Sequence, residues 1–143
     1  MVTYTPTAIT ASTTLKNSRH GDGGVVVNAA AGCTLTLPAA SGSGSKFTVY
    51  IGTTVTSNNV IIQVANASDV MAGVLVVASD NAADAAIAFE TASTSDTITL
   101  NGSTKGGIKG DYIELRDVAT NLWRVDGTLS ATGTEVTPFS AAV

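Results

Sequence analysis

The sequence predicts an all-β protein with a single domain, built as a β-sandwich or a jelly-roll-like barrel with an extended N-terminal arm. Several short segments alternate apolar and polar residues, which is the period of a half-buried strand. Only 13% of residues are charged, about half the usual share, and Thr, Val, Gly and Asn are abundant. Because Thr and Val fit a pleated surface while Gly and Asn form turns, this composition favours β-structure over a helical bundle.

The clearest element is a predicted β-hairpin near residue 120. Its first arm, Tyr112–Arg116, alternates polar and apolar residues, Asp117–Asn121 supplies the turn, and the return arm is Leu122–Asp126. Trp123 and Val125 share one face of the return arm. Trp123 is the sole tryptophan, and an indole buries on the order of 200 Å², so we expect it in the core. A ligand-stacking role is disfavoured because no second aromatic residue lies near it in sequence.

The remaining strands are predicted from short apolar or alternating runs bounded by turn residues. In chain order they are Val25–Val27, Thr34–Leu37, Phe47–Ile51, Val60–Val64, Val70–Ala78 and Thr97–Leu100. Within Val70–Ala78, Gly73 suggests a bend in a buried strand. The Ala-rich segment Ser79–Phe89 fits a short helix or a strand, and we favour a strand because its neighbours are strands.

The inward-facing positions of these strands form the predicted core. They are Val26, Leu35, Leu37, Phe47, Val49, Ile61, Val64, Ile113, Leu115, Trp123 and Val125. A weak internal repeat is also visible, in which Thr34–Leu37 and Thr97–Leu100 each precede a Gly-rich loop and an alternating strand. This reads as two hairpin-like units, which arose by duplication or by chance.

The chain divides into an N-terminal arm at residues 1–20, a β domain at residues 21–135 and a C-terminal tail at residues 136–143. The arm has no sustained hydrophobic period and contains Pro6, so it is either disordered or ordered against a partner. It carries Lys16, Arg19 and His20 and no acidic residue, whereas the rest holds five basic and eleven acidic residues, a balance of −6. The body should therefore not bind nucleic acid or anionic membrane, while the arm suits an acidic partner.

No catalytic, cofactor or metal site is predicted, and we expect that the protein is not an enzyme. Cys33 is the only cysteine, which excludes an intramolecular disulfide and paired-cysteine zinc sites, and we expect a small buried thiol. His20 lies in a Gly-rich break without a nucleophile or carboxylate pattern, so a surface histidine is expected. Gly42–Lys46 resembles a phosphate-binding loop but lacks the Gly-Lys-Ser/Thr sequence and a following helix.

Five segments together carry a family resemblance. They are Gly32–Pro38 with its Gly/Ser loop, Phe47–Val49, Thr97–Leu100, Gly110–Leu115 and Trp123–Val125. In this order they resemble small structural proteins of tailed bacteriophage particles, especially the head decoration (cement) proteins. The similarity spans roughly residues 21–139 and consists of a pattern of strands and loops.

The resemblance implies a structural virion protein that is made in the host cytoplasm and binds the outer surface of the capsid. Such proteins contact the major capsid protein, often as homotrimers, and stabilise the shell. The alternative is a tail-fibre or spike module for receptor or glycan binding, which the lack of a heptad or collagen-like stalk disfavours. A sugar-binding module would need exposed aromatic residues, for which the chain offers Tyr4, Tyr50, Tyr112 and Trp123.

We expect the capsid or intersubunit contacts to come from one of the two ends of the chain. The candidates are Tyr4, Pro6, Ile9, Leu15, Lys16 and Arg19 in the arm and Phe139 in the tail. The sequence does not choose between these two anchors.

Overall fold

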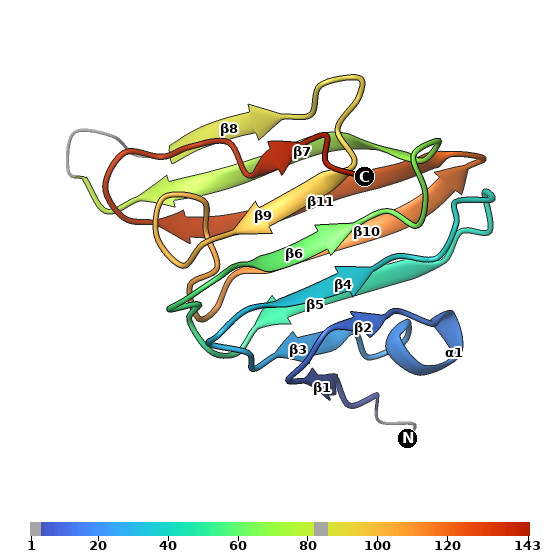
Figure 1. Ribbon diagram of the computed structural model, residues 1–143, viewed down its shortest axis with the longest axis horizontal. Helices are drawn as coiled ribbons and strands as arrows, with labels where there is room; N and C mark the ends of the chain where they lie inside the picture. Colours follow the sequence, from blue (N-terminus) through green and yellow to red (C-terminus); the bar gives the residue numbers. More distant parts are fainter. Residues whose placement is uncertain (1–3, 82–85) are drawn as a thin grey trace.

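The structure, a computed structural model that describes residues 4–81 and 86–143, consists of two β-sheets packed face to face (Figure 1). The predicted all-β sandwich is confirmed. The seven-stranded sheet has the order β1 (Thr7–Ile9), β3 (Val25–Val27), β5 (Lys46–Ile51), β10 (Tyr112–Ala119), β11 (Leu122–Ala131), β7 (Val70–Ser79), β8 (Ala86–Glu90). The five-stranded sheet has the order β12 (Phe139–Ser140), β9 (Thr97–Leu100), β6 (Val60–Gln63), β4 (Cys33–Thr36), β2 (Thr13–Thr14). One short helix, α1 (Asn17–His20), follows β2.

The N-terminal half is wound as a flattened solenoid. Successive strands alternate between the sheets, so that β1, β3 and β5 lie parallel in one sheet while β2, β4 and β6 lie parallel in the other. Parallel neighbours need a crossover connection, and here each crossover is a strand of the opposite sheet. The Thr34–Leu37 unit of the internal repeat is therefore not a hairpin, because β4 and the following β5 lie in different sheets. The same holds for β9 and β10.

The C-terminal half is closed by the hairpin that the alternation predicts. β10 and β11 pair antiparallel, and β10 also pairs antiparallel with β5, which joins the hairpin to the solenoid. The strands run further than expected, so the turn shortens to Thr120 and Asn121, the latter with a left-handed φ of 61°. β11 then continues to Ala131 and pairs in parallel with β7.

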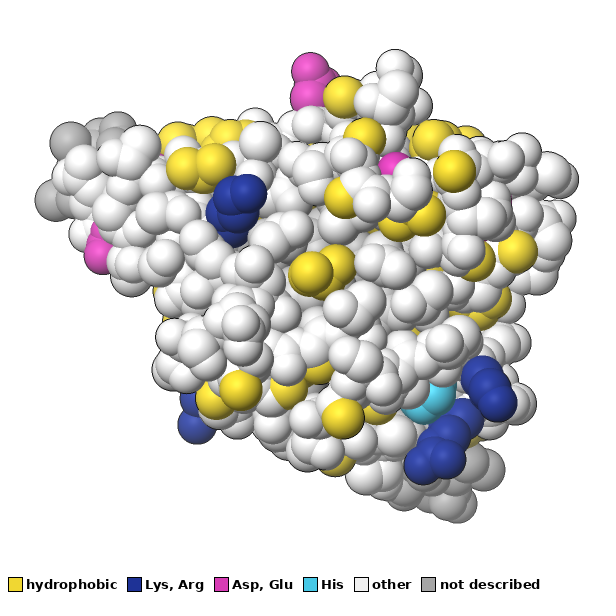
Figure 2. Space-filling model, in the orientation of Figure 1, with side chains coloured by type: hydrophobic (Ala, Val, Ile, Leu, Met, Phe, Trp, Pro, Cys, Tyr) yellow, Lys and Arg dark blue, Asp and Glu magenta, His cyan; other side chains and the backbone are white. Residues whose placement is uncertain are grey.

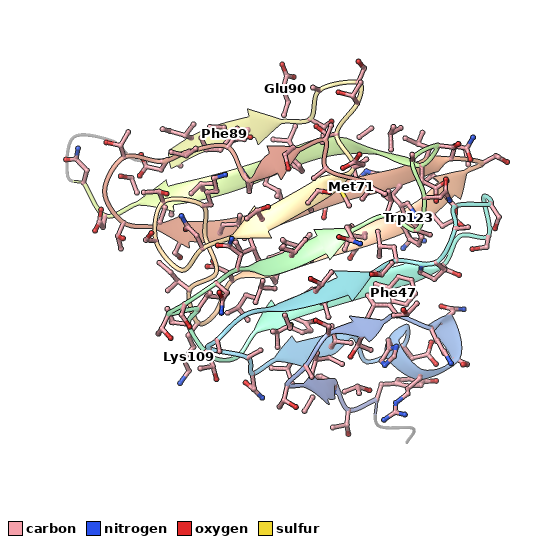
Figure 3. All side chains as sticks on the ribbon, viewed as in Figure 1. Phe47, Met71, Phe89, Glu90, Lys109 and Trp123 are labelled. Carbon is pink, nitrogen blue, oxygen red and sulfur yellow. The ribbon has the colours of Figure 1, made fainter. Side chains whose placement is uncertain are left out.

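The core lies between the sheets and is centred on Trp123, which is 1% exposed. Its ring centroid lies 5.9 Å from that of Phe47, on the neighbouring part of the same sheet (Figure 3). Nine of the eleven predicted core residues are buried, the exceptions being the half-buried Val26 and Ile61. In β3 and β6 the buried positions are instead Val25, Val27, Val60 and Ile62. Uninterrupted apolar runs have no alternation that fixes which residues face inward.

Segments of both predicted ends, residues 7–14 and 139–140, belong to the sandwich, which corrects the predicted arm and tail. β1 and β2 are strands of the two sheets, and Ile9 and Leu15 are 5% and 1% exposed. Phe139 lies in β12 and is 8% exposed. Strands of two or three residues are too short to show a period, so the pattern reads as an arm. Residues 1–3 of the predicted arm lie outside the described residues.

The segment after β6 also differs in part from expectation. Ala86–Glu90 is a strand, as favoured, while residues 82–85 of the ambiguous segment lie outside the described residues. β7 is half-buried, with Val74 and Val76 each 41% exposed on its outer face. Gly73 does not interrupt the strand; a Cβ there would collide with the carbonyl oxygen of Val125 on β11.

Candidate functional site

The first coil of the solenoid leaves two strand edges open on the same side of the molecule. Within residues 4–81 and 86–143, no strand pairs with the outer edge of β1 or of β2. We call residues 7–20 the first-coil edge. An open hollow of about 530 Å³ lies there, and its lining comprises residues of Thr7–Thr14 together with Lys16, Arg19 and His20. Unpaired strand edges present backbone N–H and C=O groups that can accept a further strand.

Helix α1 closes this coil around a buried imidazole. The side chain of His20 is 4% exposed, and its Nδ1 accepts a hydrogen bond from the backbone N–H of Lys16 at 2.8 Å. Burial lowers the pKa of His20, and the nearby charges of Arg19 and Lys16 lower it further, which favours the neutral ring that this bond requires. The expected surface histidine is therefore wrong. The ring packs against the first turn of its own helix. The sequence does not indicate this contact, because the glycines that follow His20 suggest an exposed loop.

The helix is tied to β1 but presents its cations to solvent. The hydroxyl of Thr7 donates to the backbone carbonyl of Arg19 at 3.1 Å. Lys16 and Arg19 are exposed, and in the described part of the chain neither lies within ion-pair distance of a carboxylate. Figure 2 shows basic side chains gathered beside the histidine at this corner of the molecule.

A second, polar hollow of about 460 Å³ lies between α1 and the loop before β5, and its lining includes Asp22, Lys46 and Arg116. We call this region the basic end. Its cations are Lys46 and Arg116 in this hollow, Lys16 and Arg19 in the first hollow, and Arg124, the partner of Arg116 in the β10–β11 register. It holds five of the seven Lys and Arg residues. The other two, Lys105 and Lys109, share a loop at the opposite end, where Figure 3 labels Lys109.

The Gly/Ser loop beside this hollow encloses a carboxylate of its own chain. Asp117 accepts hydrogen bonds from the backbone N–H groups of Ser41, Gly42 and Ser43 at 2.7–3.1 Å and from the Ser43 hydroxyl at 2.7 Å. Burial would raise the pKa of Asp117, but these hydrogen bonds outweigh it and lower the pKa to about 2. The loop that resembles a phosphate-binding loop thus uses its N–H groups internally.

The predicted contact residues separate into three groups. Ile9, Lys16 and Arg19 line the same hollow, and the exposed Tyr4 and Pro6 precede it along the chain. Leu15 is buried in the core and is not available to a partner. Phe139 lies on β12, at the opposite edge of the five-stranded sheet, with β9, β6 and β4 between it and β2.

Sequence reasoning did not find Lys46, Arg116 and Arg124 as members of the basic end. Lys46 and Arg116 are direct partners in the β5–β10 register, and Arg116 and Arg124 are partners in the β10–β11 register. The signal in the sequence is their outward position in alternating strands. This position shows that the three cations are neighbours only when the register of β5, β10 and β11 is known.

Other chemistry is sparse in the residues that the structure describes. Cys33 is buried, as expected, and burial raises the pKa of its thiol. Over the described ranges, no three His, Cys, Asp or Glu side chains are grouped so as to hold a metal ion. No helix there has the length and apolar character to cross a membrane. Comparison with protein-family models, with curated proteins and with solved structures finds no match for this chain.

Proposed function

We propose that the protein is a structural virion protein that binds the outer surface of a phage capsid and stabilises the shell. The order of strand and loop segments, which resembles head decoration proteins, supports this proposal. The open first-coil edge is the observation that carries it. Its partner is the major capsid protein.

The proposed contact with the capsid protein combines backbone hydrogen bonds at a strand edge with electrostatic attraction. An extended segment of the capsid protein adds to the free edge of β1 or β2, as strands add to exposed sheet edges in other complexes. Lys16 and Arg19 at this edge attract an acidic surface and orient the approach. Because both sheets begin at the same side, one partner can reach both edges.

The proposal includes a homotrimer on the capsid. β8 forms the other edge of the seven-stranded sheet, and within the described ranges its outer side has no partner strand. Its exposed side chains are Ala86, Ala88 and Glu90. Association between copies covers such an edge, and an interface between two different patches gives a ring when the rotation between copies closes.

The test compares charge reversal at the two ends of the molecule. Preformed capsids that lack the protein are incubated with wild type, with Lys16→Glu/Arg19→Glu and with the matched control Lys105→Glu/Lys109→Glu, and occupancy is measured after sedimentation. We expect the first variant to bind at least about tenfold more weakly and the control to bind as wild type does. Equal occupancy by both variants would show that the first-coil edge is not the attachment site. Failure of the wild type to bind any capsid would refute the function.

A further inference from the structure

Two tyrosines lie side by side on the outer face of the seven-stranded sheet. Tyr50 of β5 and Tyr112 of β10 are direct partners in the antiparallel register, and they are 42% and 39% exposed. Their chain neighbours Val49 and Ile113 are each 1% exposed and face the other sheet. The alternation of both strands therefore places the two phenol rings on the same solvent-facing surface.

The register extends this pair into a row that crosses the sheet without a charged residue. We call it the tyrosine row, and from β1 to β8 its members are Ala8, Val26, Tyr50, Tyr112, Thr128, Val76 and Ala88. The ring of Tyr50 lies close to Gly24: a Cβ built there would lie 3.3 Å from Cε2 of Tyr50, although the backbone oxygen of Thr48 is nearer, at 2.5 Å. The ring thus reaches over the start of β3 along the sheet surface.

A row of acceptors runs beside the tyrosine row, two residues further along the same strands. Thr48 is the register partner of Glu114, which in turn is the partner of Asp126. All three are half-buried, so a ligand on this face can still reach their side chains. Each carboxylate has one ion pair, Glu114 with Lys46 and Asp126 with Arg124. An ionised carboxylate has about four acceptor sites, so each retains capacity for further donors.

We propose that the tyrosine row is a binding site for a neutral glycan. A sugar ring has an apolar C–H face, which packs on an aromatic ring, and hydroxyl groups at its rim, which donate to carboxylates. The uncharged row and the adjacent acceptor row offer both surfaces, and the two outward tyrosines stand on neighbouring strands about 4.8 Å apart, within the span of one sugar chain. The carboxylates of the acceptor row disfavour nucleic acids and acidic sugars at this site.

The two tyrosines stand apart from the proposed capsid attachment, which shares with the tyrosine row only its end residue Ala8. In the sheet order, β5 lies two strands inward from β1, and the two tyrosines use the face of the sheet, whereas attachment uses its edge. Capsid attachment and glycan binding can therefore be refuted by different variants. Lys16→Glu/Arg19→Glu should leave glycan binding unchanged, and Tyr50→Ala/Tyr112→Ala should leave capsid occupancy unchanged.

Titration calorimetry of the purified protein with maltohexaose, cellohexaose and mannohexaose tests the proposal. We expect wild type to bind at least one of them and Tyr50→Ala or Tyr112→Ala to weaken that binding about tenfold, the usual effect of removing one aromatic stacking partner. Tyr112→Phe keeps the ring face and should bind within about threefold of wild type. Tyr4→Ala, which removes an exposed tyrosine outside the row, is the matched control and should bind as wild type does. Both tyrosines point outward, so circular dichroism and melting of each variant should match wild type.

Two outcomes would overturn the proposal. The first is that wild type binds none of the three oligosaccharides at about 10 mM, well above a millimolar dissociation constant. The second is that Tyr50→Ala/Tyr112→Ala, correctly folded, binds them as wild type does. Lower capsid occupancy of this double variant, with no sugar binding by wild type, would instead assign the row to a protein contact.

Discussion

Replacing Asp117 with asparagine should loosen the Gly/Ser loop and destabilise the whole sandwich. The carboxylate accepts hydrogen bonds from three consecutive backbone N–H groups, those of Ser41, Gly42 and Ser43. An amide has only one acceptor oxygen, so Asp117→Asn leaves some of these donors without a partner. The pKa of Asp117 falls from 3.8 to about 2 in the folded protein. By linkage this difference corresponds to about 2 kcal/mol of stability at neutral pH.

The stabilisation by Asp117 should depend on pH. Because the folded pKa lies below the unfolded one, the stabilisation by Asp117 is complete above pH 4 and is lost as the pH falls from about 4 toward 2. Urea denaturation at a series of pH values measures this directly. We expect Asp117→Asn to unfold about 2 kcal/mol more easily at pH 7, with the gap to wild type closing near pH 2.

Asp22→Asn is the matched control, because Asp22 is an exposed carboxylate next to the same loop. Its substitution should change the free energy of unfolding by less than about 0.5 kcal/mol. If Asp117→Asn is as stable as Asp22→Asn at pH 7, the ionised carboxylate does not hold the loop. A gap to wild type that stays constant from pH 5 to 2 would lead to the same conclusion.

Four further results are expected. Trp123→Ala should cost about 3 to 5 kcal/mol in urea denaturation by leaving a cavity, and a wild-type melting temperature would contradict its place in the core. Gly73→Ala should cost about 3 kcal/mol, because its methyl group meets the carbonyl oxygen of Val125, and unchanged stability would contradict the close β7–β11 approach. Stability should fall as the pH drops below about 6.5, since burial lowers the pKa of His20 and protonation breaks its bond from Lys16, and His20→Gln should flatten this dependence. Light scattering should give the mass of a trimer; a monomer both in solution and on capsids would refute the homotrimer.

The parts of the fold that the sequence predicts are those with local alternation. The β10–β11 hairpin is visible because Tyr112–Arg116 alternates strictly and a single large side chain, Trp123, marks the buried face of the return strand. Alternation fixes the side of a sheet on which each residue lies. The same property identifies Tyr50 and Tyr112 as outward residues, but only the β5–β10 register makes them neighbours.

The solenoid winding is not visible from local patterns. Its parallel pairs join Thr7 to Val25 and Val25 to Val49, contacts that are far apart in sequence. β1 and β2 have three and two residues, so each contributes little more than one inward side chain to the core. Ile9 and Leu15 therefore read as isolated anchors of an arm, although they are the inward residues of the first coil.

The location of the acidic residues changes what the net charge means. Of the ten acidic residues in the described ranges, five are buried, namely Asp69, Asp96, Asp111, Asp117 and Glu135. Several of them close loops through backbone donors: Asp111 binds Gly107, Ile108 and Ser130, and Asp96 binds Ala142 and Val143 at the chain end. Their charges are therefore engaged inside the molecule. Composition assigns a balance of −6 to residues 21–143, but part of that charge lies inside the molecule. Lys16 and Arg19, in contrast, are exposed and have no ion pair in the described part of the chain. The negative net charge of the chain therefore does not argue against the acidic partner that we propose.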